Sequence, residues 1–406
     1  MIQGMIGRTP AGDPYPVRLM GVINLSQDSF YKGSVASLRD ALSLARTMQE
    51  EGADLIDLGA VSTAPGSPPV SESEERERLF PALKSILENQ DVDVSVDTQR
   101  SSIAKEALSL GATCINDVSG LHDPAMAETV GDHDASLIIM ASLHRPGDLL
   151  TLGEIIPLLG LRVRAAVEAG VPLKKISVDP GVGKWIPEKT PAHDLAIVEG
   201  FGRLRCLGQP VVAALSRKSF IGARLNRPDP HDRLAGTLAA TAIAVFLGAH
   251  IIRTHDISSS LDTVRMAEAL RCLSAASVVE DIQAEVMAHL GHGQDLSELL
   301  RRAEVDERGW NTLCRKGSFR VVAVRGLSSM EALIIKQEML ARGGDAAIPK
   351  LALRCDPRPE EILIMGSLSQ ILSLVNNLKV QPFRLSQVAA AIEDVLGQIE
   401  NRKCSA

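Results

Sequence analysis

The sequence predicts an α/β fold, a (β/α)8 TIM barrel followed by a helical linker and a small α/β C-terminal domain. Short apolar segments alternate with amphipathic helical segments eight times before about residue 275. The apolar segments are near-continuous hydrophobic runs, which is typical of parallel strands covered on both faces. Eight such units within about 250 residues match the size of a barrel of this class.

The expected strands are short and apolar. They lie at residues 19–24, 55–59, 92–97, 113–117, 137–141, 176–179, 211–215 and 250–253. Helical patterns fill the gaps, for example at residues 38–50, 72–88, 103–110, 158–169, 233–247 and 260–273. A doubly wound open sheet is the alternative on this pattern. The first strand is not followed by G-x-G-x-x-G, and this disfavours the alternative.

The pattern changes after about residue 278. We expect three segments: the barrel at residues 1–278, a polar helical connection at 279–317 and a small α/β domain at 318–406. In the last segment, strands are expected at 319–324 and 361–365, and helices at 329–341, 367–378 and 385–399. It lacks a cluster of His, Cys and Asp, which favours a structural or oligomerisation role.

The composition excludes several classes of partner. Lys and Arg total 43 against 50 Asp and Glu, so the formal net charge is −7. A mildly acidic chain is a poor binder of nucleic acid and of anionic membranes. Aromatic residues make up only 3% of the chain, which argues against base-stacking surfaces. We therefore expect neither a nucleic-acid nor a membrane partner.

Three observations indicate a cytoplasmic protein. The six cysteines are scattered, and none are spaced as C-x2-C, so reduced thiols are expected. The N-terminus lacks the charged-then-apolar pattern of a signal peptide. No apolar run reaches the roughly 18 to 20 residues of a membrane span.

Polar residues that could carry chemistry follow the expected strands. Asp179 begins the run Asp-Pro-Gly-Val-Gly, and Lys218 lies in Ser-Arg-Lys-Ser after the next strand. The same position is shared by Asn24, Asp97, Asn116, Arg253 and His255. Carboxyl ends of parallel strands meet at one barrel mouth, where active sites are built. Helix capping by Asp and turn formation by Asn are the structural alternatives.

Nine segments match a known enzyme family in the family's own order. They are MGVIN (20–24) with DSF (28–30), GADLIDLG (52–59), STAPG (62–66), VSVDT (94–98), INDVSG (115–120), DPGVG (179–183), SRKSFIG (216–222), RLAGT (233–237) and RTHD (253–256). On these segments the chain resembles dihydropteroate synthase, the folate-pathway enzyme that joins a pterin to p-aminobenzoate. The resemblance covers about residues 18 to 275. Residues 335–347 resemble an accessory segment attached to some bacterial members.

The resemblance implies a site for each substrate, the pterin methyl diphosphate and p-aminobenzoate. The pterin would contact Asp97, Asn116, Met140, Asp179 and Lys218. The diphosphate would contact Asn24, Arg253 and His255, with Mg²⁺ held at Asn24. The p-aminobenzoate would lie near Thr63, Pro65 and Ser219, with charge from Lys218 and Arg217. Catalysis would rest on Asp97, Lys218, Arg253 and His255.

The implied roles suit these residue types. A pterin edge needs carboxylate acceptors and amide or ammonium donors in a closed pocket. Mg²⁺ keeps most of its waters, so a single Asn is compatible with binding it. The reaction needs no enzymic nucleophile, because electrostatics and positioning suffice. The resemblance also implies a homodimer formed through barrel helices.

The chain departs from the family's pattern in several loops. The second loop normally reads Ser-Thr-Arg-Pro-Gly, and here Ala64 replaces the Arg. The first loop has Ser26-Gln27 where Thr-Pro is usual. Gly183 normally leads to a Phe that packs on the substrates, but here it leads to Lys184-Trp185 and an insertion at 186–190. Lys184 is a candidate for the missing cation, and Trp185 for the missing aromatic.

A further departure lies at residues 140–148, which lack the usual Met-His-Met-Arg run. His144 and Arg145 are candidates for similar parts. These departures leave two alternatives to an active synthase. One is a pterin-binding partner subunit with weak or no activity, and the other is a pterin-dependent methyltransferase acting on methyltetrahydrofolate.

Overall fold

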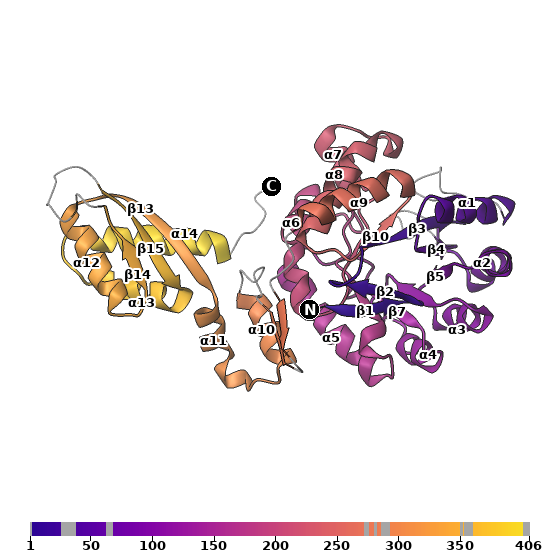
Figure 1. The fold of residues 1–406 in the computed structure, drawn as a ribbon, viewed down its shortest axis with the longest axis horizontal. Helices are drawn as coiled ribbons and strands as arrows, with labels where there is room; N and C mark the ends of the chain where they lie inside the picture. Colours follow the sequence, from indigo (N-terminus) through magenta and orange to yellow (C-terminus); the bar gives the residue numbers. More distant parts are fainter. Residues whose placement is uncertain are drawn as a thin grey trace. The chain divides into compact units, whose positions relative to one another are not determined.

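A computed structural model of the chain describes residues 2–25, 38–61, 68–271, 276–279, 282–285, 293–349, 352 and 360–400. The chain divides into two compact units, Met1–His289 and Leu290–Ala406 (Figure 1). We describe each unit by itself. The finer division into three segments at 278 and 317 stays a prediction.

The first unit is built on a sheet of eight parallel strands. In spatial order they are β8 (Ile176–Asp179), β7 (Ser136–Met140), β6 (Cys114–Asp117), β5 (Asp93–Asp97), β4 (Leu55–Gly59), β3 (Arg18–Asn24), β10 (Ile251–Thr254) and β9 (Val212–Ala213). A parallel bridge between Val178 and Val211 joins the two ends of the sheet. The predicted barrel is confirmed, and the open doubly wound alternative is wrong.

The strands form where the sequence is continuously apolar. Every residue of β4, β6, β7 and β8 is buried. Parallel strands covered on both faces require this pattern. The strand expected at 211–215 is shortened to β9, because the chain turns at Arg217, whose φ is 56°. The Lys218 N–H closes this turn on the Leu215 carbonyl at 3.4 Å.

Helices lie outside the strands (Figure 1). They are α1 (Leu38–Glu50), α2 (Glu72–Asn89), α3 (Ser101–Leu110), α4 (Met126–Asp132), α5 (Leu152–Glu168), α6 (Pro191–Glu199), α7 (Ser219–Leu225), α8 (Leu234–Leu247) and α9 (Ile257–Leu270). Sequence-encoded caps start several of them. Ser71 and Glu74 form a reciprocal capping box at α2, and Thr151 and Glu154 do so at α5. These caps fix where each βα loop ends.

A hairpin that the sequence did not predict precedes the barrel. It pairs β1 (Gln3–Ile6) with β2 (Thr9–Gly12) in antiparallel register. Its Ile6 and Ala11 share one buried cluster with Met20, Leu55, Cys114, Ile138, Val212 and Ile251, which lie in the barrel strands. The two strands contain Gly, Pro and polar residues, so no apolar alternation marked them in the sequence.

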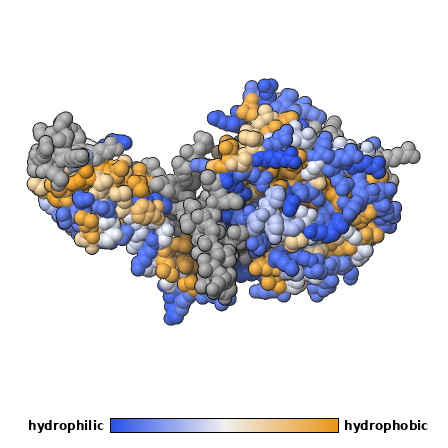
Figure 2. Space-filling model, in the orientation of Figure 1, coloured by the Kyte–Doolittle hydropathy of each residue, from blue (hydrophilic) through white to orange (hydrophobic). Residues whose placement is uncertain are grey.

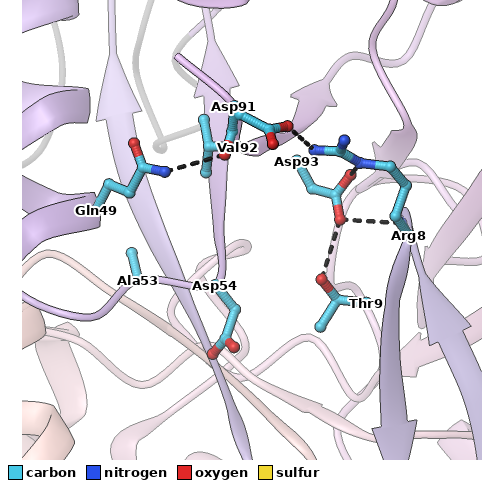
Figure 3. Close-up of a pocket in the computed structure, with 8 residues that line it drawn as sticks. All are labelled: Arg8, Thr9, Gln49, Ala53, Asp54, Asp91, Val92 and Asp93. Carbon is cyan, nitrogen blue, oxygen red and sulfur yellow. Dashed lines mark hydrogen bonds and ion pairs between the residues drawn. The ribbon is translucent and has the colours of Figure 1, made fainter.

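A small polar pocket lies beside this hairpin (Figure 3). Arg8 lies there between two carboxylates, Asp91 at 2.8 Å and Asp93 at 2.9 Å. Asp93 is the first residue of β5, whereas Asp97 is the last. The pocket is therefore at the opposite end of the barrel from the carboxyl ends of the strands, and ion pairs already satisfy its charges.

The second unit is a three-stranded antiparallel sheet in the order β13 (Phe319–Leu327), β15 (Glu360–Ser367), β14 (Asp345–Ala347). It carries α12 (Ser329–Leu340), α13 (Leu368–Leu378) and α14 (Leu385–Glu400), and α10 (Gly293–Arg302) and α11 (Trp310–Gly317) precede it. Its own core includes Ile335, Ile364, Ile371, Leu374 and Ile392. The predicted small α/β unit is confirmed, while the short strand β14 was not foreseen.

One more hairpin, β11 (Ala276–Val279) with β12 (Ile282–Glu285), ends the first unit where helical structure was expected. Among the described helices of both units, none has the length and apolar character needed to cross a membrane.

Candidate active site

The polar residues singled out in the sequence lie at one end of the barrel. Asn24, Asp97 and Asp179 are the last residues of β3, β5 and β8. In the sheet register, Asn24 pairs with Gly59, Gly59 with Asp97, and Asp97 with Asn116. Met140 at the end of β7 pairs with Asp179. This register places the carboxyl-terminal parts of six adjacent strands, β3 to β8, side by side around one mouth.

Arg253 is the central cation of this mouth. Its Nε donates to Asp57 Oδ2 at 2.7 Å, and one terminal nitrogen donates to Asp97 Oδ2 at 3.0 Å. Asn116 Nδ2 donates to the same Asp57 oxygen at 3.2 Å. Guanidinium–carboxylate pairs of this kind are strong and directional. Arg253 therefore binds carboxylates from two neighbouring strands.

Asp57 is a site residue that sequence reasoning missed. It lies inside β4 and is fully buried, and among the described residues its Oδ1 has no hydrogen-bond partner. A signal for it existed, because a carboxylate inside the apolar run Leu-Ile-Asp-Leu-Gly is costly unless it is paired. Its partner Arg253 lies 196 residues away in sequence, so the pairing itself was not readable.

The charged groups in this cluster shift one another's pKa values. Burial raises the pKa of Asp97 to about 7; the Arg253 guanidinium opposes this shift and the Asp57 carboxylate adds to it. Burial lowers the pKa of Arg253, but the Asp57 and Asp97 carboxylates more than offset it, and the net shift is upward. Arg253 therefore stays charged, while the pKa of Asp97 lies near neutral pH.

Asp179 and Lys218 carry opposite charges in the mouth and influence each other electrostatically. Asp179 Oδ1 accepts the Gly181 N–H at 2.7 Å, and burial raises the pKa of Asp179 above its ordinary value. Burial lowers the pKa of Lys218 to about 8, the Arg253 charge acting in the same direction. Lys218 is thus an ammonium that loses its proton close to physiological pH.

Trp185, in the loop after β8, lies over Lys218. The Lys218 Nζ is 4.8 Å from the centroid of the indole ring, a cation–π distance. The indole Nε1 donates to the Gly181 carbonyl at 3.0 Å. A Cβ at Gly147 would lie 2.1 Å from the indole Cδ1, so this position leaves room only for glycine. Lys184, the other residue singled out in this loop, is exposed.

His255 follows β10 and is hydrogen-bonded to Ser216. The Ser216 Oγ lies 2.9 Å from His255 Nδ1, and the His255 N–H donates to the same hydroxyl at 3.3 Å. Burial and the positive charges of Arg253, Arg217 and Lys218 lower the pKa of His255 to about 3. The imidazole is therefore neutral at physiological pH and interacts through hydrogen bonds rather than through charge.

Arg217 is held by contacts with two other loops of the barrel. Its guanidinium pairs with Asp256 at 2.6 and 2.9 Å and donates to the carbonyls of Pro230 and His231 at 2.8 and 2.9 Å. A contribution of its charge to an acceptor site stays a prediction. Arg217 holds together the loops that follow β9 and β10.

The remaining expected residues divide into described and undescribed ones. Asn24 Oδ1 and the Asp97 side chain both approach the open side of Gly59, at 3.9 and 3.4 Å from the point where a Cβ would lie. Ser219 is the first residue of α7, directly after Lys218. Thr63 and Pro65, together with Ala64 and Ser26-Gln27, lie outside the described residues.

A second polar pocket adjoins Asp97 on the side of α2. Its lining includes Glu75, Thr98 and Arg100. Glu75 is buried and accepts Thr98 Oγ1 at 2.7 Å, and it is ion-paired with Arg100. These contacts tie the residues just after β5 to α2, which fixes the backbone that carries Asp97.

Comparison with known proteins agrees with this geometry. A family model described as pterin binding enzyme matches residues 20–255, more than half of the chain. The chain is 38% identical over 254 residues to a dihydropteroate synthase of Bacillus subtilis, covering 62% of this chain and 88% of that protein. This chain belongs to the dihydropteroate synthase family. The expectation of an enzyme, a transferase of folate biosynthesis, is thereby confirmed.

Two further comparisons define the extent of the match to dihydropteroate synthases. A Thermus thermophilus dihydropteroate synthase, solved in complex with 4-aminobenzoate, superimposes with a TM-score of 0.58 at 36% identity, covering 66% of this chain and 99% of that one. A probable bifunctional folylpolyglutamate synthase/dihydropteroate synthase of Halobacterium salinarum is 37% identical over 66% of this chain. The match spans 34%, about a third, of that longer protein.

Proposed function

We propose that the protein condenses (7,8-dihydropterin-6-yl)methyl diphosphate with p-aminobenzoate to give 7,8-dihydropteroate and diphosphate. The observation that supports this most is the bonding of Arg253 to both Asp57 and Asp97 at the carboxyl ends of the barrel strands. Asp179 ends β8, and Lys218 follows β9, the strand that closes the barrel against β8. Carboxylates and amide donors can bind a polar heterocycle, and a cation among them can bind a departing anion.

The pterin ring would be held by hydrogen bonds from several strands. Asp97 and Asp179 accept from its amino and ring N–H groups, and Asn116 and Lys218 donate to its carbonyl and ring nitrogens. Met140 is 2% exposed and would pack on the ring. Fixed donors and acceptors in a water-poor pocket bind such an edge because partners left unpaired there are costly.

Catalysis would consist of stabilising charge as it separates. The bond between the pterin methylene carbon and the diphosphate oxygen breaks, and its electron pair leaves with diphosphate. Arg253 supplies positive charge near the leaving oxygens, and the neutral His255 supplies a hydrogen bond. The Asp97 carboxylate stabilises the cationic methylene. The amine of p-aminobenzoate then attacks that carbon and releases a proton.

Mg²⁺ would neutralise the charge of the departing diphosphate. The residues present fit this ion, since Asn24 offers a hard amide oxygen next to Asp97 over Gly59. Among the described residues, no group of three or more His, Cys, Asp or Glu side chains is placed to hold a metal. Asn24 would therefore hold the ion together with water and substrate oxygens.

The second substrate would lie next to the Lys218–Ser219 turn. Thr63 and Pro65 belong to this site by their match to the family's p-aminobenzoate loop. The start of α7 presents its first N–H groups at Ser219, and a helix N-terminus favours a carboxylate. The Thermus relative solved with 4-aminobenzoate supports this choice of acceptor.

A homodimer in the cytoplasm completes the proposal. The side chains of Ile243 and Phe246 on α8 are each 51% exposed, and Met266 and Leu270 on α9 are exposed by 62% and 65%. Figure 2 shows hydrophobic surface on the α7–α9 side of the barrel unit. Contiguous exposed apolar side chains are typical of a protein interface. A Phe246→Glu variant should sediment as a monomer, whereas a wild-type protein that is already monomeric would refute the dimer.

A partner subunit with weak activity is the second candidate, and Ala64 in place of the family's Arg favours it. Nothing among the described contacts favours a methyltransferase. Diphosphate release from purified protein, with Mg²⁺ and both substrates, separates the candidates. We expect release that requires both substrates, and its loss in Asp97→Ala and Lys218→Ala at unchanged far-UV circular dichroism. Pterin binding without release would favour the partner subunit.

A variant at the second loop tests whether the missing cation matters. If the loss of the family's Arg limits turnover, Ala64→Arg should raise the rate of diphosphate release. An unchanged rate would mean that another group already supplies that charge.

A further inference from the structure

A lysine with no assigned role is buried beneath the mouth. Lys189 lies in the insertion after Trp185 and is only 1% exposed, so it is among the largest fully buried side chains of the described residues. A buried ammonium is costly unless its charge and its donors are matched. Its surroundings should therefore reveal what it does.

Two backbone carbonyls from different loops accept hydrogen bonds from Lys189. Its Nζ donates to the Gly181 carbonyl at 2.7 Å and to the Gly147 carbonyl at 3.2 Å. Burial lowers the pKa of Lys189, and three carboxylates oppose this shift: Asp194 on α6, Asp179 at the end of β8 and Asp148 in the loop after β7. The ammonium thus joins two βα loops and interacts electrostatically with three carboxylates.

Gly181 is the junction between Lys189 and the mouth. Its N–H donates to Asp179 Oδ1, and its carbonyl accepts both Lys189 Nζ and Trp185 Nε1. Its φ is 72°, a left-handed conformation that favours glycine. One residue therefore orients both the Asp179 carboxylate and the indole that lies over Lys218.

The same loop is held from a second side by Asp194. Its Oδ1 accepts the Gly183 N–H at 2.8 Å. Lys189 and Asp194 together bond to the backbone at Gly181 and Gly183, on both sides of Val182. The loop is fixed by side chains that do not themselves reach the strand ends.

We propose that Lys189 is a positioning residue: through Gly181, it sets the orientation of Asp179 toward the pterin and keeps Trp185 over Lys218. This inference rests on the proposed pterin-binding role of Asp179. A residue that only linked two loops would contribute to the stability of the fold and not to substrate binding. Lys189 should in addition change pterin affinity and the environment of Trp185, because both depend on the Gly181 peptide.

The test uses Lys189→Met in the full-length protein, with Lys174→Met as the matched control. Methionine keeps an unbranched stem and removes the ammonium, while Lys174 is an exposed lysine in the short 3-10 helix before β8. The chain has two tryptophans, Trp185 and Trp310, so a Trp310→Phe background makes the fluorescence report on Trp185 alone.

We expect Lys189→Met to bind the dihydropterin methyl diphosphate about tenfold more weakly by calorimetry. Acrylamide should quench Trp185 more strongly in this variant, and Lys174→Met should behave as the parent does. Pterin affinity and Trp185 quenching that both match the parent would overturn the proposal. If Lys189→Met does not fold, Lys189→Gln, whose uncharged side chain is one atom shorter, should show the same two changes, and parental values there would equally overturn it.

The pH dependence of pterin binding is a further readout. It would not change if Lys189 only linked two loops. The charged groups that act on Asp179 are Lys218 after β9, Arg253 on β10 and Lys189 before α6, and each lowers its pKa. Removing Lys189 should raise the pKa of Asp179, and the acid limb of pterin binding, to which both Asp97 and Asp179 contribute, should move to higher pH. An unmoved limb would contradict the proposal. If the parent binds no pterin, the proposed function fails, and quenching of Trp185 still tests Lys189.

Discussion

Asp57 shows how one buried carboxylate organises the residues around it. It binds Arg253 and Asn116 through the same oxygen, so it links β4 to β10 and β6. An arginine with two carboxylates keeps a fixed position before substrate arrives. Such preorganisation, rather than any nucleophile, is what a charge-separating reaction needs.

Replacing Asp57 by asparagine should therefore cost activity more than stability. We expect Asp57→Asn to lower kcat/KM by about 100-fold or more, because Arg253 loses one of its two carboxylates and its orientation. The thermal midpoint should change little, since the amide fills the same volume. Steady-state kinetics and thermal denaturation of the same preparation would measure both. A kcat/KM within threefold of the parent would contradict this role.

The pH dependence should follow Asp97 and Lys218. Pterin binding uses the ionised Asp97, so activity falls as pH drops through a pKa of about 7. It uses the protonated Lys218, so activity also falls as pH rises through about 8. The profile of kcat/KM should be bell-shaped, with an acid limb that belongs to the coupled carboxylate cluster.

Lys218→Arg provides the control for the basic limb. Arginine keeps its charge throughout this range, so the limb near pH 8 should disappear even if the overall rate is lower. A basic limb that persists in Lys218→Arg would assign it to another group.

The residues that sequence reasoning found and missed differ in one physical respect. Asp97, Asp179 and Lys218 were found because strand ends in a barrel must share a mouth, whatever their side chains contact. Asp57 and Lys189 were missed because their roles depend on partners at Arg253, Gly147 and Gly181. Those contacts are set by tertiary packing, which no local pattern encodes.

At the scale of elements, the hairpin β1–β2 ends in an ionic cluster that joins it to the barrel. Asp13 pairs with Arg205 at 2.7 Å, with His250 at 3.2 Å and with Arg271 at 3.2 Å. Burial by itself would raise the pKa of Asp13, but the hydrogen bonds from His250 and Arg205 hold it well below its usual range. One carboxylate therefore neutralises the buried Arg205 and the partly buried Arg271.

Removing this carboxylate should destabilise the barrel strongly. We expect Asp13→Ala to lower the free energy of unfolding by about 3 to 5 kcal/mol, because two buried guanidinium groups lose their counter-charge. The exposed Asp91 offers the matched control, and Asp91→Ala should change it by less than about 1 kcal/mol. Urea denaturation would measure both variants.

The pH sets the range in which this effect is visible. The pKa of Asp13 is lowered in the folded state, so its contribution is present above the ordinary aspartate pKa and is lost as pH falls below it. The difference between the parent and Asp13→Ala should therefore shrink in acid. A difference that stays constant down to about pH 3 would contradict the ionic account.

Strands and helices with strong local signals were predictable, and weakly patterned ones were not. β4 and β8 are near-continuous apolar runs, and the structure has them at the expected residues. β1, β2 and β14 are three or four residues long and mix Gly, Pro, Asp or Ala. Such strands form because neighbours supply hydrogen bonds and cover, not because their own residues favour extended structure.

At the scale of the whole molecule, every described site residue lies in the first unit, and the second unit has its own core. Units with separate cores can fold separately. We expect a chain ending at His289 to retain kcat/KM within about threefold of the parent, and the full chain to show two calorimetric transitions. A loss of more than tenfold on truncation would mean that the second unit contributes to catalysis.

The lowered pKa of Lys218 has a consequence for chemical reagents. With a pKa of about 8, roughly one molecule in ten carries a neutral amine there at pH 7, against fewer than one in a thousand for an ordinary lysine. The neutral amine is the form that attacks activated esters and aldehydes. The group expected to hold the pterin would thus also make this barrel unusually sensitive to acylation, and bound substrate would protect it.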